Sequence, residues 1–310
     1  MKKTITIGII LVISTIFRTE AQTTITNALR LLQQKNFVSA LDVCNDLLAS
    51  SSNDASVLGV RSQIYTAMGR YDQATADADK ALSIDNSSAR AYFAKAEVLF
   101  YGRKDYNQAL QQYDAAIRSN AQMTEAHSGK ARALMGQQKQ KDALKVVEDA
   151  LKLFPSEPEL NYLHGLLNYQ SGKYKPAVDD YDKVLSLDPE WNTHSVLLNR
   201  GFANDALLKS DLALQDFTKA ISADPNNVSG YVARGNLLYN NTNYQDAAED
   251  FKKAEVLSPD NSVITYNIGM SYYKIEDKAA ACRYFQKACS MKNDNACKMV
   301  VLNCSDRRTN

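Results

Sequence analysis

One alanine-centred pattern returns eight times along this chain and constrains its fold more than any other feature. Successive alanines of the pattern are 34, 35, 34, 34, 36, 34 and 34 residues apart. They are Ala40, Ala74, Ala109, Ala143, Ala177, Ala213, Ala247 and Ala281. A period near 34 residues is typical of solenoids made of antiparallel helix pairs, in which each pair buries its apolar face against the next. The pattern predicts an all-α array. Such an array acts through the surface that it presents, since repeats by themselves build no reaction centre.

Each repeat carries further residues at fixed distances from its alanine. In most repeats a small residue such as Gly201 lies twelve positions earlier, and it allows two helices to approach closely. Five repeats place an aromatic residue such as Phe217 four positions after the alanine, where it is expected to fill the space against the next repeat. Proline ends four of the repeats, because it cannot continue a helix interior. These prolines are Pro155, Pro189, Pro225 and Pro259.

Segments such as Leu-Asn-Arg-Gly at 198–201 and the run at 216–225 resemble tetratricopeptide repeats almost residue for residue. The resemblance implies a right-handed superhelical solenoid over residues 22–304, closed by a capping helix at 295–304 and followed by a tail at 305–310. The eight expected helix-turn-helix repeats span about 22–54, 55–88, 89–123, 124–157, 158–193, 194–227, 228–261 and 262–294.

Two spacings depart from the period. The third repeat has one extra residue between Gly102 and Asp105, and two extra residues precede the sixth, between Pro189 and His194. The second insertion contains Trp191, the single tryptophan of the chain. Its ring either packs over the lengthened turn or forms an exposed contact, since tryptophan is enriched at binding hot spots.

The first residues have the pattern of an export signal. Lys2 and Lys3 precede an apolar stretch at 5–17, and small residues follow up to Ala21. The stretch is too short to span a bilayer, so we expect cleavage after residue 21 and a periplasmic or secreted protein, or a lumenal one in a eukaryote. Those 21 residues hold three basic residues and one acidic, so their removal changes the formal charge from +1 to −1. A nearly neutral chain argues against nucleic acid as the ligand.

Four of the five cysteines lie at the C-terminal end. Cys289 and Cys297 are each four residues from Asn293, whereas Cys282 and Cys304 are each eleven residues from it. If two antiparallel helices meet at a turn around Asn293, residues equally distant from the turn face each other. A bond along one helix would have to bridge about 10 Å between Cα atoms, which a disulfide does not tolerate. The spacing predicts the pairs Cys289 with Cys297 and Cys282 with Cys304.

The fifth cysteine and the histidines indicate no chemistry. Cys44 takes a bulky core position and is expected to be a buried free thiol. His127, His164 and His194 lie in different repeats without metal-ligand spacing, and His164 is interpreted as a structural histidine. No catalytic motif or phosphate loop occurs, so we expect no enzyme activity, no metal and no cofactor.

The resemblance implies that the first helix of each repeat lines a concave groove, where a protein or peptide would bind. Candidate groove residues are Phe93, Glu97, Arg132, Tyr162, Tyr169, Phe202, Asn236, Tyr239, Tyr266, Met270 and Tyr273. Aromatic groups dominate the later repeats and favour a peptide with apolar anchors, unless they pack against a neighbouring second helix. Relatives that bind acidic C-terminal tails use a clamp of lysine and asparagine. This chain has Ile25, Leu29, Gly59, Gln63, Phe93 and Glu97 at the matching places, so the clamp is absent.

These observations favour an exported, non-enzymatic interaction scaffold of unidentified protein or peptide partner. One alternative is a structural subunit of an envelope assembly or a homo-oligomer. The other is a chaperone-like holdase, if the same signal leads to the lumen of a eukaryotic endoplasmic reticulum.

Overall fold

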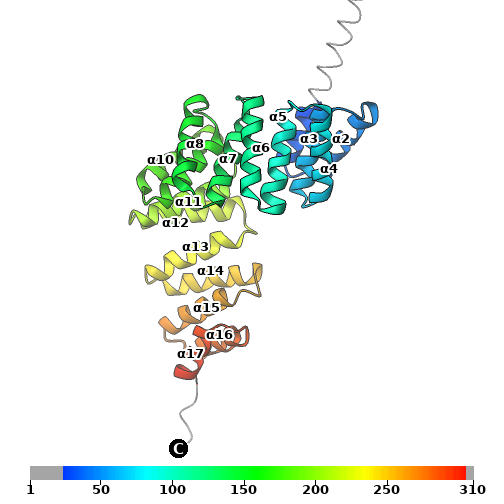
Figure 1. Ribbon diagram of the computed structural model, residues 1–310. Coiled ribbons are helices and arrows are strands. Elements are labelled where there is room, and N and C mark those ends of the chain that lie inside the picture. The colour runs from blue at the N-terminus through cyan, green and yellow to red at the C-terminus, as the bar shows by residue number, and fades with distance from the viewer. Residues whose placement is uncertain (1–23, 305–310) are drawn as a thin grey trace, which may run out of the picture. The chain divides into compact units, whose positions relative to one another are not determined.

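The computed structural model describes residues 24–304, and every regular element in that range is a helix (Figure 1). A helical segment at 24–33 precedes α2 (Phe37–Ser50), α3 (Ala55–Ala67), α4 (Tyr71–Ile84), α5 (Ala89–Glu97), η1 (Val98–Arg103), α6 (Tyr106–Ser119), α7 (Thr124–Gly136), α8 (Gln140–Leu153) and α9 (Pro158–Gln170). There follow α10 (Tyr174–Leu187), α11 (Thr193–Ala206), α12 (Ser210–Ala223), α13 (Val228–Asn240), α14 (Tyr244–Leu257), α15 (Ser262–Lys274), α16 (Lys278–Ser290) and α17 (Asp294–Asn303). The predicted all-α class is confirmed.

The helices group into two compact units, an N-terminal unit up to Leu163 and a C-terminal unit from His164. The division falls inside α9, a feature that the repeat pattern over 22–304 does not indicate. The expected export signal at 1–21 and the tail at 305–310 lie outside the described residues. Among residues 24–304, none of the helices has the length and apolar character needed to cross a membrane.

The turn inside each helical pair repeats with the same period as the alanines. Five residues before each alanine, the backbone takes a positive φ, between 53° and 74° in every pair. The residues are Lys35, Gly69, Lys104, Gln138, Gly172, Leu208, Thr242 and Glu276. A left-handed residue is a common way to end a helix, and only two of the eight are glycine. The eight alanines that follow are at most 1 % exposed, which explains why each repeat keeps a small side chain there.

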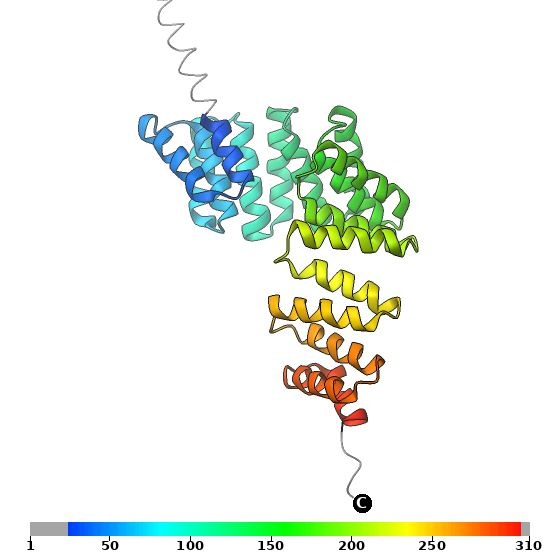
Figure 2. The same ribbon diagram turned by 180° about the vertical axis from the view of Figure 1, so that it is seen from behind.

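In the C-terminal unit, the small residue of each first helix makes room for an aromatic ring of the second. A Cβ added to Gly201 would lie 2.5 Å from the ring of Phe217, and one added to Gly269 would lie 2.7 Å from Phe285. The pairs Gly165 with Tyr181 and Gly235 with Phe251 have the same geometry. These rings therefore lie over the glycine of their own pair, in addition to any contact with the next pair. The successive helices α13 to α16 lie side by side in both views (Figures 1 and 2).

The extra residue of the third repeat is accommodated as a turn of π-helix, η1, at the end of α5. Such single-turn widenings occur where one residue is inserted into a helix, and they are frequent at functional sites. Gly102 of η1 lies directly on Tyr71, because a Cβ there would be 2.8 Å from the Tyr71 ring. The insertion thus turns Tyr101 to the side of the helix where it meets α7.

The two extra residues of the sixth repeat form the turn before α11. Asn192 precedes α11 with φ of 45°, and Trp191 is half-buried. His194 stands at the start of α11 between two neighbours, with Nδ1 2.9 Å from the carbonyl oxygen of Ala220 and Nε2 3.0 Å from Oγ of Ser229. His194 therefore joins α11 to the helices that follow it.

Buried ion pairs connect the two helices of several pairs. Arg200 of α11 donates from Nε to Oδ2 of Asp216 in α12 at 3.1 Å, and Asn204 donates to the same oxygen at 2.9 Å. Nη2 of Arg200 donates to the other oxygen, Oδ1 of Asp216, and this two-point contact is repeated by Arg234 with Asp250 and by Arg61 with Asp77. At the same place in the fifth repeat, Nδ1 of His164 lies 2.9 Å from Asp180. His164 is thus a structural residue.

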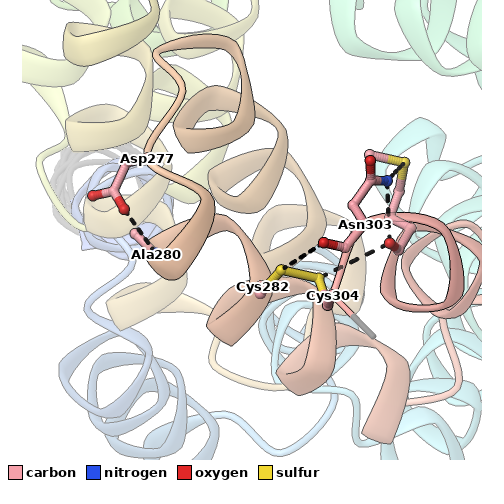
Figure 3. The surroundings of a disulfide bond; sticks show 6 residues. Asp277, Ala280, Cys282, Asn303 and Cys304 are labelled. Atoms are coloured by element: carbon pink, nitrogen blue, oxygen red, sulfur yellow. Dashed lines mark hydrogen bonds between the residues drawn. A yellow bond between two sulfur atoms is a disulfide. The ribbon is translucent and has the colours of Figure 1, made fainter. Parts of the chain in front are cut away.

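The C-terminal end is closed by α17, which packs antiparallel to α16 (Figure 3). Asn293 caps α17 by accepting from the N–H of Ala296 at 3.0 Å. The disulfides join Cys282 to Cys304 and Cys289 to Cys297, with Cα atoms 5.5 Å and 4.6 Å apart. This is the connectivity that the spacing about Asn293 predicts.

The remaining cysteine, Cys44, is a free thiol in the core of the N-terminal unit. Burial raises its pKa to about 12, so it stays protonated and unreactive at neutral pH.

Candidate functional site

The N-terminal unit contains a pocket of about 700 Å³, formed mainly by the first helices of successive repeats. Its charged residues are Arg90, Glu97, Glu125, Arg132 and Glu159. The polar wall includes Gln63, Thr66 and Tyr101, and the apolar wall includes Leu29, Leu32, Met68 and Phe93. A cavity of this size with an apolar wall and a few converging polar groups is typical of ligand sites.

Arg132, on α7, is the centre of the polar side of the pocket. Its Nη1 donates to the hydroxyl of Tyr101 at 2.9 Å, and its Nη2 donates to Oε1 of Glu97 at 3.2 Å. Oε1 of Glu159 is 3.6 Å from Nη1. The hydroxyl of Tyr113 donates to Glu97 from the other side. Helices α5, η1, α6, α7 and α9 therefore all contribute to one network.

The guanidinium of Arg132 also lies near two rings, 5.9 Å from the centroid of Phe100 and 6.0 Å from that of Tyr101. Its Nε is buried and has no hydrogen-bond partner within residues 24–304. The two hydrogen bonds and the two ring contacts, rather than Nε, hold the guanidinium of Arg132 in place.

A second ion pair lies along the pocket, where Nη1 of Arg90 is 3.3 Å from Oε1 of Glu125. Arg90, Glu125 and Glu159 occupy the same position in three successive repeats, 35 and 34 residues apart. Glu97 and Arg132 likewise share one position, 35 residues apart. The charges of the pocket are therefore two rows of equivalent positions on the first helices.

The carboxyl of Glu159 is the least compensated charge of the pocket. Burial raises its pKa above the usual value of 4.5 and outweighs the attraction of Arg132, while Glu97, Glu157 and Glu125 raise it further. The pKa of Arg132 is raised as well, because Glu97 and Glu159 favour its charge against the cost of burial. Burial also raises the pKa of Tyr101 and Tyr113, so both phenols stay neutral hydrogen-bonding groups at neutral pH.

Three of the predicted groove residues, Phe93, Glu97 and Arg132, are brought together in this pocket. Phe93 is buried at 5 % exposure. The other candidates do not line it: Tyr162, Tyr169, Tyr239, Tyr266, Met270 and Tyr273 are half-buried, while Phe202 and Asn236 are exposed.

Several of the aromatic candidates in the C-terminal unit pack on the second helix of their own pair. Ring centroids are 5.1 Å apart for Phe202 and Phe217, and 5.8 Å apart for Tyr266 and Phe285. Tyr273 also packs on Phe285, Tyr169 on Tyr174, and Tyr239 on Tyr244. The alternative to exposure in the groove was packing against the second helix of a neighbouring repeat. In these contacts the second helix belongs to the same repeat.

Sequence reasoning missed Tyr101, Arg90, Glu125 and Glu159. The inserted residue near Gly102 is a signal for Tyr101, because an insertion in an otherwise strict period marks an altered helix. Arg90, Glu125 and Glu159 lie at a position that was not among the expected groove positions. Their repetition at intervals of 35 and 34 residues is the signal that would have found them.

The chain belongs to the tetratricopeptide repeat family. Models of that family match residues 55–88, 98–143, 128–190, 228–261 and 264–295, which together cover more than half of the chain.

Among curated proteins, it is 24% identical over 249 residues to a DnaJ homolog subfamily C member 7 homolog of Dictyostelium discoideum, covering 80% of this chain and 42% of the relative. It is 25% identical over 245 residues to the Hsp70-Hsp90 organizing protein of Triticum aestivum, covering 74% and 39%. The chain thus spans about two fifths of the length of these relatives. Among solved structures, the Cut9–Hcn1 hetero-tetramer of the APC/C is similar, with a TM-score of 0.71, 13% identity and coverage of 91% of this chain and 55% of that one. This likeness concerns the fold.

Proposed function

We propose that the protein is a non-enzymatic interaction scaffold that binds a peptide segment of a partner protein in the pocket of its N-terminal unit. The observation that carries this proposal is the pocket of about 700 Å³, in which five charged side chains converge on an apolar wall. Charges held in a partly apolar pocket are expensive unless they are satisfied, and a bound partner satisfies them. The name of the wheat relative, an organizing protein, is consistent with a scaffold role.

We further propose that the protein works in an oxidising compartment, as the export signal predicts. The two disulfides of the C-terminal cap support this, because disulfides persist in exported proteins and are rare in the cytosol. Non-reducing peptide mapping of protein from its native source tests the proposal. Free thiols at Cys282, Cys289, Cys297 and Cys304 would contradict it.

The pocket is tested by blocking it without disturbing its buried network. Ala67 is the last residue of α3, is exposed and lines the pocket, so Ala67→Trp places a large ring in the opening. Ala206 is the last residue of α11, is also exposed and occupies the equivalent position of the C-terminal unit, so Ala206→Trp is the matched control.

Both variants are compared with the unchanged chain in crosslinking capture from the native fraction. We expect the partner to be lost with Ala67→Trp and retained with Ala206→Trp. If capture survives Ala67→Trp but is lost from the Tyr162→Ala, Tyr266→Ala double variant, binding belongs to the aromatic positions and the pocket is not the site.

One observation favours the structural-subunit alternative. The last helix, α17, exposes Val301 at 71% and Leu302 at 70%. Two apolar residues on a terminal helix favour attachment at that end. Light scattering of the unchanged chain and of the Val301→Ser, Leu302→Ser double variant tests self-assembly. The two masses should differ only if the chain assembles through α17.

A further inference from the structure

We propose that the pocket of the N-terminal unit recognises a basic side chain, an arginine or lysine of the bound peptide. This inference rests on the peptide-binding function proposed above and names the chemistry of the ligand. It follows from the balance of charges, from the acceptors on the polar wall and from the position of the apolar wall.

The charges of the pocket leave one carboxylate in excess. Three glutamates and two arginines line it. Glu97 is hydrogen-bonded by both Arg132 and Tyr113, and Glu125 is paired with Arg90. Glu159 makes no hydrogen bond through its carboxylate in the described part of the chain and has only the ion pair at 3.6 Å to Arg132. An added cation would complete the pairing of Glu159.

The polar wall offers acceptors rather than donors. Gln63 lines the pocket at 8 % exposure, and its amide nitrogen is directed to the carbonyl oxygen of Gly59 at 3.4 Å. The amide oxygen of Gln63 is an acceptor on the same wall of the pocket. The hydroxyl of Thr66, a residue at 6 % exposure, donates to the carbonyl oxygen of Ser62 at 2.9 Å. The hydroxyl oxygen can therefore only accept a hydrogen bond from a ligand.

The outer nitrogens of Arg132, by contrast, are already engaged. The two outer nitrogens of Arg132 bind Tyr101 and Glu97, and its Nε is buried away from solvent. An incoming carboxylate or phosphate would find few free donors and would face the charges of Glu97, Glu125 and Glu159. The pocket therefore disfavours an acidic segment.

The apolar wall suits the long stem of a basic residue. Leu29, Leu32, Met68 and Phe93 line the same cavity as the carboxylates. Arginine and lysine bury a methylene chain along apolar surface while their charged head reaches a polar site. A short apolar neighbour of the basic residue in the peptide would use the rest of the 700 Å³.

The test is fluorescence anisotropy of the whole chain with labelled decapeptides that differ at one fixed position, which is arginine, lysine, glutamine or glutamate. We expect the arginine and lysine peptides to bind at least tenfold more tightly than the glutamine peptide, and the glutamate peptide to bind most weakly. Ala67→Trp should abolish binding of all of them.

Glu159→Gln removes the excess carboxylate at nearly constant shape. This variant should bind the basic peptides about tenfold more weakly and bind the glutamine peptide with unchanged affinity. Glu255→Gln is the control, because Glu255 is a similarly covered carboxylate on α14 that accepts from Thr265 and pairs with Lys287, outside the pocket. Circular dichroism of both variants verifies that the helices are intact.

The outcomes separate the two proposals. Binding of the glutamine or glutamate peptide that equals or exceeds that of the basic ones, and that Ala67→Trp blocks, overturns the basic-ligand inference and leaves the peptide-binding function intact. Equal binding of every peptide by the unchanged chain and by Ala67→Trp removes the pocket as a peptide site and overturns both.

Discussion

The two units carry different side chains at equivalent positions of their first helices. In the N-terminal unit, the position that follows the small residue of the first helix carries Glu97 and Arg132, which form the pocket network. In the C-terminal unit, the same position carries Phe202, Asn236 and Met270. The row of Arg90, Glu125 and Glu159 is replaced there by Ser195, Ser229 and Val263.

The backbone scaffold of the two units is nevertheless the same. Both have the buried alanine, the left-handed turn residue and the two-point arginine–aspartate pair between helices. The comparison shows that a repeat separates its structural positions from its variable ones. The structural positions make a helical pair, and the variable positions decide whether that pair presents charged side chains or packed rings.

The largest loss of stability is expected from removing an aromatic ring that only packs in the core. Phe285 is fully buried over Gly269, so Phe285→Ala should lower the free energy of unfolding by about 3–5 kcal/mol. Tyr101, which is 44% exposed at the pocket, is the contrasting aromatic, and Tyr101→Ala should cost much less in stability but weaken peptide binding. Urea unfolding followed by circular dichroism measures the first effect. Equal losses of stability in the two variants would contradict the division between packing and binding rings.

The next effect concerns the buried ion pairs that both units share. Asp216→Ala leaves Arg200 and Asn204 without their common acceptor, so it should destabilise by about 3 kcal/mol. The exposed pair of Asp149 with Lys152 is the comparison, and Asp149→Ala should leave the melting temperature unchanged. Neither variant should alter peptide affinity, since neither aspartate lines the pocket. Thermal unfolding and anisotropy on the same samples test both statements.

A smaller effect is expected from restoring the period of the third repeat. Deleting Lys104 shortens the spacing between Ala74 and Ala109 from 35 to 34 residues, and a regular α-helical turn should replace η1. Tyr101 then loses its place beside Arg132, so binding of the basic peptide should weaken by roughly tenfold while the helix content stays the same. Deleting one residue from the turn at 190–192, in the C-terminal unit, should not change the affinity. A deletion of Lys104 that binds as tightly as the full chain would show that η1 has no part in the site.

The smallest effect is a pH dependence of binding. Burial raises the pKa of Glu159 above 4.5, and the groups facing it are Arg132, Glu97, Glu125 and Glu157. A basic ligand prefers the ionised carboxylate, so its affinity should fall as the pH drops from 7 through the raised pKa. In Glu159→Gln this part of the fall should disappear, which anisotropy between pH 7 and 5 will measure. An unchanged pH profile in that variant would mean that Glu159 does not contact the basic group.

Much of the molecule follows from short-range patterns. The period of the alanines predicts the helical pairs, and the equal distances of the four cysteines from Asn293 predict their pairing. The structural role of His164 was likewise predicted, because the three histidines lie in different repeats without metal-ligand spacing. Of the predicted groove residues, Phe93, Glu97 and Arg132 lie in the pocket, while the aromatic positions of the later repeats lie outside it. Sequence alone could not separate them, because a tyrosine has the same spacing whether it packs on its own pair or faces a ligand.

By itself, the sequence determined the helix pairs, the turns between them and the cysteine connectivity, because each depends on residues within one or two turns of an element or across a single turn. Only the tertiary structure decided that Gln63, Tyr101, Arg132 and Glu159 line one cavity. These residues come from four different elements, and the pKa of Glu159 depends on its burial and on the charges of Arg132, Glu97, Glu157 and Glu125. Burial is a property of packed neighbours, which no local spacing records.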